Sequence, residues 1–578
     1  MREGRFIITC LTALLLTGCA GRVRTVSVEL AATSDIHGNF FPYDFTSAPG
    51  TPAEGSLARV STWLEEARRE YGDRLICLDA GDILQGSPLT YQDKIADFSG
   101  KSVAGCLLTE LGWDVATIGN HDLESGILVL DKYVESCDFP IVCANFVYEA
   151  SGRSIMQPYT IVERDGLRIA VVGMTTPYAS FKIPQSNIDG YTFRSVVETA
   201  AEIIPYIREK EHPHVIVGLF HSGLQDGKNN GVFDENETYR TAVSVPGFDA
   251  IIYGHDHCPA CTKVADCNGD SVLLINPGAY ADNLALVRLD VTFAGDSVLD
   301  CRVEGNIADM DRLAPDAAFE KRHQDRIDAV WNFQDSVIGS VDMPLNGMEA
   351  VFGPSSVTDF INSMLLLESG SEISISSAYL TDLDIKAGNV TMRDMWNLYP
   401  YENNMTLMSM KGSEIVDVLE YFSGRWMNTV KTPADTLIKA VRDGDGYSLE
   451  YPLFDFMTAG GIDYTVDVTR PAGERVNVIS MSDGSAFNPE RVYRVALSSF
   501  LACGGYQPFC DALGIEGFKL RQRELISSRT DYRYTIICRL ADKAADGNSL
   551  HVAHPANWKL VPEQLAGSIL ARDRKMFQ

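Results

Sequence analysis

The chain has 578 residues, of which 45% are hydrophobic and 22% are charged, so it can bury more than one core and is neither disordered nor collagen-like. Its 49 Lys and Arg residues stand against 78 Asp and Glu residues, which gives a formal net charge of −29. Such acidity argues against a protein that binds polymeric nucleic acid through a broad basic face. An anionic substrate would have to be attracted locally, by metal ions or by a few placed cations.

The N-terminus has the pattern of a bacterial export signal. Arg2 and Arg5 precede an apolar run over residues 6–16, which is too short to span a bilayer. The run ends in Leu-Thr-Gly-Cys19, which resembles a lipobox. We therefore predict a lipoprotein signal peptide over residues 1–19, lipidation of Cys19, and an extracytoplasmic protein tethered to a bacterial membrane, at the periplasmic side or the cell surface. A cleaved secretory signal without lipidation is the alternative.

From residue 26 to about residue 305, short apolar runs alternate with amphipathic segments. The amphipathic stretches at 57–69 and 196–210 predict helices. The apolar runs are rich in β-branched residues and bounded by Gly, Asp or Pro, as buried strands are. We expect these strands at 28–32, 75–78, 115–118, 141–144, 169–172, 215–219, 250–253 and 272–275. The pattern indicates an α/β layered domain over residues 26–305.

A polar passage follows, and we predict a linker helix within residues 306–335. Beyond it, over residues 336–578, the pattern of mixed strands and helices predicts a separate α+β domain. Its strand candidates are 407–410, 464–468, 493–496 and 534–538. The spacing of Cys258, Cys261 and Cys267 allows one disulfide in an oxidising compartment.

Polar residues that can bind metal stand where the predicted strands of the first domain end. In an open α/β sheet, ligands bind beyond the carboxyl ends of the strands, so these loops can converge on one site. Taken singly, each motif is also typical of a capped turn or a solvated histidine. The loops contain Asp35-Ile-His37, Gly81-Asp82, Gly119-Asn120-His121-Asp122, His221 and Gly254-His255-Asp-His257.

The set supplies donors for two divalent metal ions. One site would use Asp35, His37 and His257, the other Asn120, His221 and His255, with Asp82 bridging both. A mixed imidazole and carboxylate set favours Zn, Mn, Fe or Co over Ca or Mg. Two such ions can bind a phosphate ester and activate water.

This ordered set resembles the motifs of the calcineurin-like metallophosphoesterases, which run D-x-H, G-D, G-N-H-[DE], H and G-H-x-H. The resemblance implies a sandwich of two mixed sheets flanked by helices. It also implies that His121 acts on the substrate, by stabilising the transition state or protonating the leaving oxygen. In the nucleotidase branch an acidic residue three positions on orients this histidine, which is Glu124 here. Asp122 is nearer in sequence, so both carboxylates are candidate catalytic partners.

The two-domain layout resembles the secreted 5′-nucleotidase and 2′,3′-cyclic-nucleotide phosphodiesterase family over nearly all of the mature chain. The matching C-terminal stretches are 398–405, 465–476 and 499–505. The resemblance implies a nucleotide-binding C-terminal domain in which two aromatic rings sandwich the base. We assign Phe500 and Phe454 as these rings, with Tyr506 as substitute and Asn404 as a further substrate-binding residue. The alternative for each aromatic residue is a place in the core.

One departure from this family narrows the substrate. The 5′-nucleotidases carry phosphate-clamping arginines near the segment that is 375–382 here, and this segment has none. Lys386 and Arg393 are the nearest cations. We therefore predict a 2′,3′-cyclic-nucleotide 2′-phosphodiesterase/3′-nucleotidase, with two alternatives. These are a 5′-nucleotidase, with or without nucleotide-sugar hydrolase activity, and a non-catalytic nucleotide-binding lipoprotein. The oligomeric state is left open.

Overall fold

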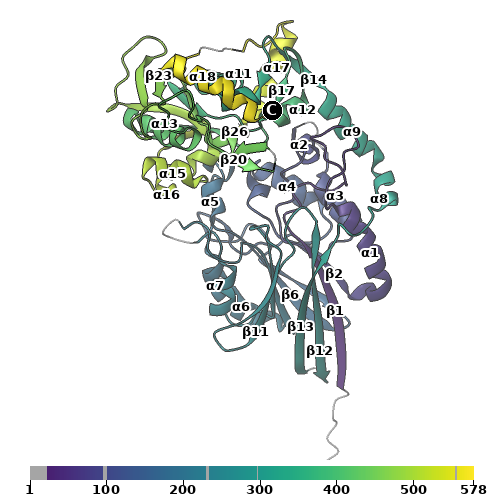
Figure 1. The fold of residues 1–578 in the computed structure, drawn as a ribbon. Coiled ribbons are helices and arrows are strands. Elements are labelled where there is room, and N and C mark those ends of the chain that lie inside the picture. The colour runs from purple at the N-terminus through teal and green to yellow at the C-terminus, as the bar shows by residue number, and fades with distance from the viewer. Residues whose placement is uncertain are drawn as a thin grey trace, which may run out of the picture.

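The computed structural model describes residues 23–95, 100–229, 234–295, 297–444, 446–552 and 556–577. The predicted signal peptide and Cys19 lie outside these ranges. Within them, no helix has the length and hydrophobicity needed to span a bilayer. The chain forms two parts, and the helices α8 (Ala317–Arg322) and α9 (Gln324–Asp335) run between them along one side of the molecule (Figure 1).

The N-terminal part is built on two sheets packed face to face. The first has the strand order β13-β12-β1-β2-β3, and the second β10-β11-β9-β8-β6-β5. The strands of the first sheet are β1 (Val23–Thr33), β2 (Leu75–Asp79), β3 (Val115–Ala116), β12 (Asn283–Ala294) and β13 (Ser297–Asp309). Those of the second are β5 (Tyr159–Arg164), β6 (Leu167–Thr175), β8 (Val215–His221), β9 (Ala250–Tyr253), β10 (Ala260–Ala265) and β11 (Ser271–Asn276).

Side-chain alternation along the strands creates three apolar layers. On β1, Val28 and Leu30 pack between the sheets, whereas Ala31 faces the helices outside. The helices α1 (Leu57–Tyr71), α3 (Val103–Glu110) and α4 (Ile127–Ser136) contribute to the layer outside the first sheet. The helices α6 (Val196–Glu211) and α7 (Thr238–Ser244) cover the second sheet. The predicted α/β sandwich is confirmed.

The predicted strand at 141–144 is wrong, and the reason is its path between the two sheets. Val142 N–H donates to Ala116 of the first sheet, while Ala144 N–H donates to Gly173 of the second. Only isolated bridges form along the segment. Its side chains are buried in all three apolar layers, so its composition reflects burial where the two sheets adjoin rather than membership of either one.

The C-terminal part is an α+β unit with its own core. A five-stranded sheet has the order β22-β16-β25-β19-β26, and a three-stranded sheet the order β24-β23-β27. Around them pack helices that include α11 (Ser356–Ser369) and α13 (Gly412–Trp426). The strands of the two sheets are β16 (Ile373–Ser376), β19 (Asn404–Lys411), β22 (Thr458–Gly460), β23 (Ile462–Asp467), β24 (Val476–Met481), β25 (Val492–Ser498), β26 (Glu524–Asp531) and β27 (Trp558–Val561).

The predicted strand at 534–538 is wrong, because these residues lie in the helix α17 (Tyr532–Ala545). The Asp531 side chain accepts a hydrogen bond from Tyr534 N–H and caps the helix. The buried side chains of Tyr532, Ile536 and Leu540 recur at helical spacing. The predicted segment was too short to show this helical repeat, and its β-branched and aromatic residues are typical of a strand.

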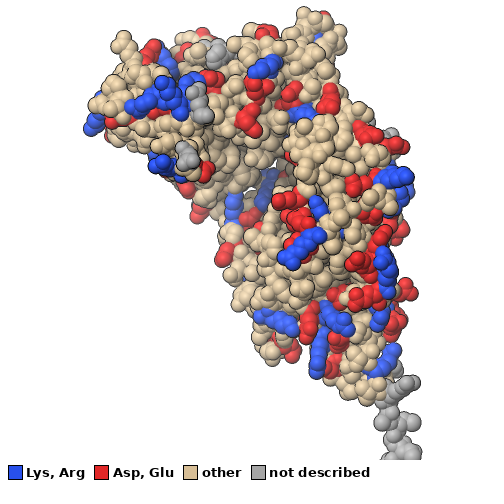
Figure 2. Space-filling view, turned by 45° about the vertical axis from the view of Figure 1, so that its right-hand side comes forward, with Lys and Arg blue, Asp and Glu red and all other residues tan. Residues whose placement is uncertain are grey.

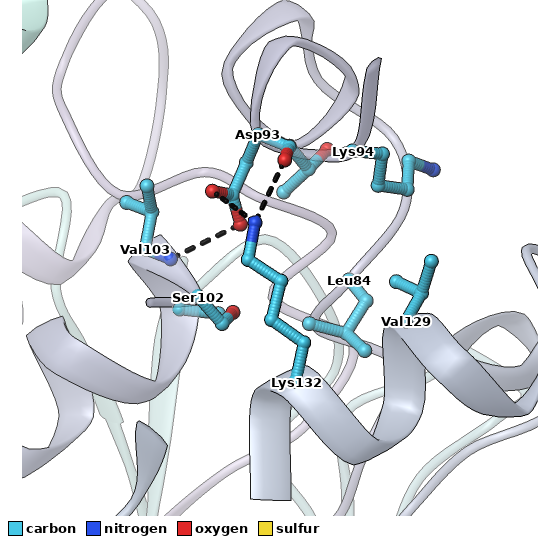
Figure 3. A pocket seen from close by; sticks show the side chains of 9 residues that line it. Leu84, Asp93, Lys94, Ser102, Val103, Val129 and Lys132 are labelled. Atoms are coloured by element: carbon cyan, nitrogen blue, oxygen red, sulfur yellow. Dashed lines mark hydrogen bonds and ion pairs between the residues drawn. The ribbon is translucent and has the colours of Figure 1, made fainter. Parts of the chain in front are cut away.

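Short helices of the N-terminal part connect it to the C-terminal part. In α2 (Pro88–Ile95), Tyr91 is buried in the C-terminal core, and its hydroxyl donates to Asp531 Oδ1 over 3.1 Å. In Figure 3, Lys132 of α4 donates to the carbonyl oxygen and to Oδ1 of Asp93, at 2.9 and 3.1 Å, and Val103 N–H donates to Asp93 Oδ2. These contacts fix α2 against α3 and α4, and thereby help to set how the two parts face each other.

No disulfide is present among the cysteines that the structure describes. Cys258, Cys261 and Cys267 are exposed free thiols. The single disulfide that the sequence allows among these three residues does not form.

Candidate active site

The polar loops that the sequence singled out meet at one edge of the sandwich. Strands β1, β2 and β3 are parallel to one another in the first sheet, and β8 and β9 are parallel in the second. Their carboxyl ends therefore point to the same edge. The residues gathered there are Asp35, His37, Asp82, Asn120, His121, His221, His255 and His257, all in or next to the loops that follow these strands.

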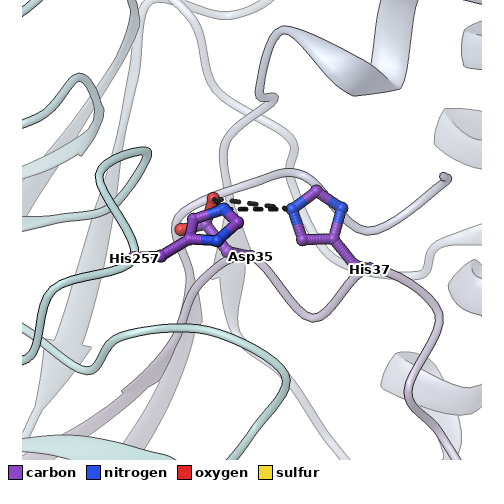
Figure 4. A group of neighbouring side chains, drawn as sticks. All are labelled: Asp35, His37 and His257. Atoms are coloured by element: carbon purple, nitrogen blue, oxygen red, sulfur yellow. Dashed lines mark hydrogen bonds and ion pairs between the residues drawn. The ribbon is translucent and has the colours of Figure 1, made fainter. Parts of the chain in front are cut away.

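Asp35, His37 and His257 form a first group that could hold a metal ion (Figure 4). The Nε2 atoms of the two histidines are 3.2 Å apart, and Nε2 of His257 is 3.2 Å from Asp35 Oδ1. Asp35 is fully buried and His37 is nearly so. Imidazole nitrogens and a carboxylate oxygen thus converge on one point.

Asp82, His221 and His255 form a second such group. Nε2 of His221 lies 3.0 Å from Asp82 Oδ2 and 3.9 Å from Asp35 Oδ1, so the two groups adjoin. Asn120 is fully buried in the same region. Asp82, which the sequence predicts as the bridge, is grouped here with His221 and His255.

Several buried polar atoms of these groups have no hydrogen-bond partner, which fits a metal site. They are Asp35 Oδ1, Asp82 Oδ2, His221 Nε2, and both Oδ1 and Nδ2 of Asn120. A buried polar group without a partner costs about 1–3 kcal/mol, so such a cluster calls for a bound group that satisfies it. Oxygen and imidazole donors are those that Zn, Mn, Fe and Co accept.

Hydrogen bonds on the far side of two rings orient the free nitrogens inward. Nδ1 of His37 lies 3.0 Å from the carbonyl oxygen of Gln85, and Nδ1 of His221 lies 2.8 Å from that of Ala80. Because a carbonyl oxygen only accepts, each Nδ1 must donate, which leaves Nε2 as a lone-pair donor. His255 is turned the other way, with Nε2 3.2 Å from Glu235 Oε1.

The backbone is strained at the same residues. Asp35, His37, Asp82, His255 and His257 all have positive φ, between 50° and 82°. Residues with side chains rarely adopt this region, and such strain gathers at functional sites, where the surrounding structure maintains it.

Two glycines allow the loops to approach closely. A Cβ atom at Gly119 would lie 2.0 Å from Asp82 Oδ1, and one at Gly254 would lie 2.5 Å from Asp35 Oδ2. A larger residue at either position would displace a carboxylate of the site.

His121 lies beside these groups without belonging to either. Its backbone N–H donates to Asp82 Oδ1 over 2.7 Å, and its Nδ1 pairs with Glu124 Oε1 at 2.8 Å. Asp122 does not pair with the ring. Its buried carboxylate accepts hydrogen bonds from four backbone N–H groups of the 82–84 and 119 loops instead. The geometry therefore favours Glu124 over Asp122 as the partner of His121, and the Asp122 carboxylate contacts the backbone of the loops.

Neighbouring carboxylates raise the pKa of His121. Burial disfavours the charged form of its ring, but Glu124 and Asp82 raise the pKa to about 9. The protonated form of His121 is therefore favoured at neutral pH.

A cavity of about 390 Å³ leads from His121 into the C-terminal part. Figure 2 shows the molecule hollowed between its upper and lower parts. His121, Glu124 and Lys182 line the N-terminal end of the cavity. Tyr379, Tyr401, Phe454, Phe500, Tyr506 and small polar residues line the other end. The size is that of a small-molecule site.

All three predicted aromatic residues line this cavity. The Phe454 and Tyr506 rings meet edge to face with centroids 5.7 Å apart, and Phe500 and Tyr506 are tilted by 34° at 6.3 Å. Phe500 is 46% exposed, and a Cβ atom at Gly505 would lie 2.4 Å from its ring. Phe500 therefore packs against Gly505 and lines the cavity with a partly exposed ring.

Asn404, which we predicted to bind substrate, is not among the described residues that line the cavity. Its side chain is buried, and Nδ2 donates to the carbonyl oxygen of Ser528. The neighbouring Asn403 lines the cavity instead. Asn404 starts β19, where successive side chains point to opposite sides, so a shift of one residue exchanges cavity and core.

Two charged residues of the site were not predicted from the sequence. Glu235 contacts His255, and Lys182 pairs with Glu235 at 2.9 Å. Neither residue stands in a motif or directly follows a strand, so only the folded chain brings them to the site.

Comparisons with known proteins agree with this architecture. Residues 29–259 match the calcineurin-like phosphoesterase family, and residues 337–513 match the C-terminal domain of 5′-nucleotidases. Among curated relatives, the trifunctional nucleotide phosphoesterase YfkN of Bacillus subtilis is 26% identical over 547 residues, which cover 83% of this chain and 36% of that protein. The chain thus spans about a third of that relative's length.

Two further proteins match over most of their own length. A 2′,3′-cyclic-nucleotide 2′-phosphodiesterase/3′-nucleotidase of Salmonella typhimurium is 23% identical over 622 residues, covering 96% of this chain and 92% of that one. The crystal structure of a candidate 5′-nucleotidase from Staphylococcus aureus superimposes with a TM-score of 0.69 at 22% identity, covering 93% of this chain and 100% of that one. The N-terminal part, over residues 29–259, therefore belongs to the calcineurin-like phosphoesterases, which are metal-dependent hydrolases of phosphoester bonds, and residues 337–513 belong to the C-terminal domain of the 5′-nucleotidases.

Proposed function

We propose that this chain is a two-metal phosphohydrolase of extracytoplasmic nucleotides. Asp35, His37 and His257 would hold one ion, Asn120, His221 and His255 the other, and Asp82 would be shared. The unpartnered buried atoms and the inward-facing imidazole nitrogens support this assignment. When bound, the two ions would supply electrostatic stabilisation of the phosphoryl group and activation of water.

In this proposal the protein's own residues position the ester and deliver a proton. His121 faces the cavity beside the metal groups, and Glu124 holds its ring by the contact at Nδ1. Nε2 is then the atom from which a proton can pass to the leaving oxygen. Glu124 is a positioning residue, because it acts through His121.

A single observation carries the assignment to nucleotides. One cavity joins His121 at the phosphate end to Phe454, Phe500 and Tyr506 at the other. Aromatic rings offer flat faces on which any base can stack. The names of the Salmonella and Bacillus relatives, both nucleotide phosphoesterases, point the same way.

Within the nucleotides, we propose a 2′,3′-cyclic-nucleotide 2′-phosphodiesterase/3′-nucleotidase. The segment 375–382 contributes Ser377 and Tyr379 to the cavity, and neither Lys386 nor Arg393 is among the described lining residues. A 5′-monophosphate is a dianion, whereas a 2′,3′-cyclic ester is a monoanion. The absence of an arginine fork should therefore reduce the binding energy of the 5′-monophosphate more than that of the cyclic ester. We expect kcat/KM for 2′,3′-cAMP to exceed that for 5′-AMP under one metal condition. A preference for 5′-AMP would favour the 5′-nucleotidase alternative.

Phe500→Ala tests the base-binding role. Stacking contributes about 1–3 kcal/mol per base, so KM for 2′,3′-cAMP should rise roughly tenfold or more. Hydrolysis of an aryl phosphodiester that has no base should change little, because that substrate does not reach the ring. Equal loss on both substrates would make Phe500 a structural residue and remove its stacking role.

We further propose that the chain is held at a membrane by lipid on Cys19. The lipobox-like sequence supports this proposal. Cys19→Ala should move the protein from the membrane fraction to the soluble fraction of the cell, as followed by immunoblotting. Unchanged membrane fractionation would contradict lipid anchoring.

A further inference from the structure

One end of the cavity between the two parts carries a positively charged side chain. Among its described lining residues, Lys182 is the only Lys or Arg, and it lies at the same end as His121 and Glu124. It ends the short helix α5 (Ala179–Lys182) of the N-terminal part. The positive charge that a phosphate needs is therefore present, but on the domain that carries the candidate metal groups.

Lys182 is held in place by an acid that also contacts one of these groups. Its Nζ lies 2.9 Å from Glu235 Oε1, which is also 3.2 Å from His255 Nε2. The other carboxylate oxygen of Glu235 accepts a hydrogen bond from Lys228 N–H over 3.0 Å. An ammonium group has three donors, and the described contacts of Lys182 include this one acidic partner, so donors are left for a ligand.

Three other cations, of which two follow segment 375–382 in the sequence, are engaged elsewhere. Lys386 is 77% exposed and pairs with Asp384. Arg393 donates to the carbonyl oxygen of Phe45 and pairs with Asp335. Lys228 Nζ donates to the carbonyl oxygens of Gly504 and Gly505. None of these three lines the cavity among the residues that the structure describes.

We infer that Lys182 binds the phosphate group of the substrate and supplies the cationic contact that segment 375–382 lacks. This inference rests on the proposed function, because it assigns a phosphate to the metal end of the cavity. Lys182 belongs to the N-terminal part, so its contact does not depend on the base. Loss of Lys182 should weaken the binding of nucleotides and of base-free phosphate esters alike, whereas loss of Phe500 should weaken the binding of nucleotides alone.

The direct test is binding of inorganic phosphate to the metal-loaded full chain, measured by calorimetry without turnover. Lys182→Met removes a hydrogen bond between two charged groups, which contributes more free energy than one between neutral groups. It should therefore weaken phosphate binding roughly 10- to 100-fold. Lys182→Gln should do the same, and Lys182→Arg should recover part of the affinity because it keeps the charge. Lys386→Met is the matched control, which removes an exposed lysine and should leave phosphate affinity unchanged.

Two further measurements separate phosphate binding from a structural role. Metal content, measured for each variant, should stay at the wild-type level. KM for 2′,3′-cAMP and for an aryl phosphodiester should rise by the same factor in Lys182→Met. If metal content falls, and phosphate affinity returns when metal is added in excess, Lys182 merely braces Glu235 and His255, and the inference is overturned.

The remaining outcomes are also decisive. Equal phosphate affinity in wild type and Lys182→Met, with metals retained, overturns the inference even if the wild type hydrolyses nucleotides. Conversely, a wild-type protein that binds phosphate through Lys182 but hydrolyses none of the esters overturns the proposed function and supports the phosphate site.

Discussion

Asp82→Ala is expected to lower the bound metal and to abolish phosphoester hydrolysis. Asp82 Oδ2 is buried, 3.0 Å from Nε2 of His221, and Asp82 is the ligand that we propose both metal ions share. Removing it takes away a shared anionic ligand and leaves the imidazoles without its charge. Metal analysis and a chromogenic phosphodiester assay on the purified protein measure the two effects together.

Asp82→Asn provides the graded control for this prediction. It keeps one ligand oxygen but loses the charge, so its metal content and its rate should fall between those of the wild type and Asp82→Ala. Thermal unfolding of each variant shows whether the fold is retained. An Asp82→Ala protein that holds two metals per chain and turns over normally would contradict the two-metal assignment.

His121→Ala is expected to reduce kcat by roughly 10²- to 10⁴-fold, the usual contribution of a positioned acid–base group. Metal content should be unchanged, for two structural reasons. The His121 side chain belongs to neither metal group, and its contact with Asp82 is made by the backbone N–H, which alanine retains. Steady-state kinetics and metal analysis on the same preparation measure both quantities.

Glu124→Gln is the companion variant, because Glu124 acts through the ring of His121. It should lower kcat less than His121→Ala does, and the double variant should be no slower than His121→Ala alone. If metal content falls in step with the rate in His121→Ala, then His121 is a metal ligand and its assignment as a proton donor is wrong.

Much of the fold and of the candidate metal site could be predicted from the sequence, because both depend on local patterns. Apolar runs with polar residues directly after them mark strands and their carboxyl ends, and parallel strands bring those ends to one edge. Asp35, Asp82, His221 and His255 are therefore placed together by topology alone. The pattern failed over 141–144 and 534–538, because a buried connecting segment and the buried face of a helix also produce short apolar runs.

Only the tertiary structure determined which polar side chains contact each other. Both Asp122 and Glu124 lie close to His121 in sequence, yet Asp122 is taken up by backbone N–H groups and Glu124 reaches the ring. Lys182 and Glu235 are distant in sequence. The fold places Lys182, at the end of α5, in the wall of the cavity and beside Glu235. Sequence patterns record which face of an element is buried. Contacts between polar side chains across a cavity arise from long-range packing, which leaves no period or motif in the chain.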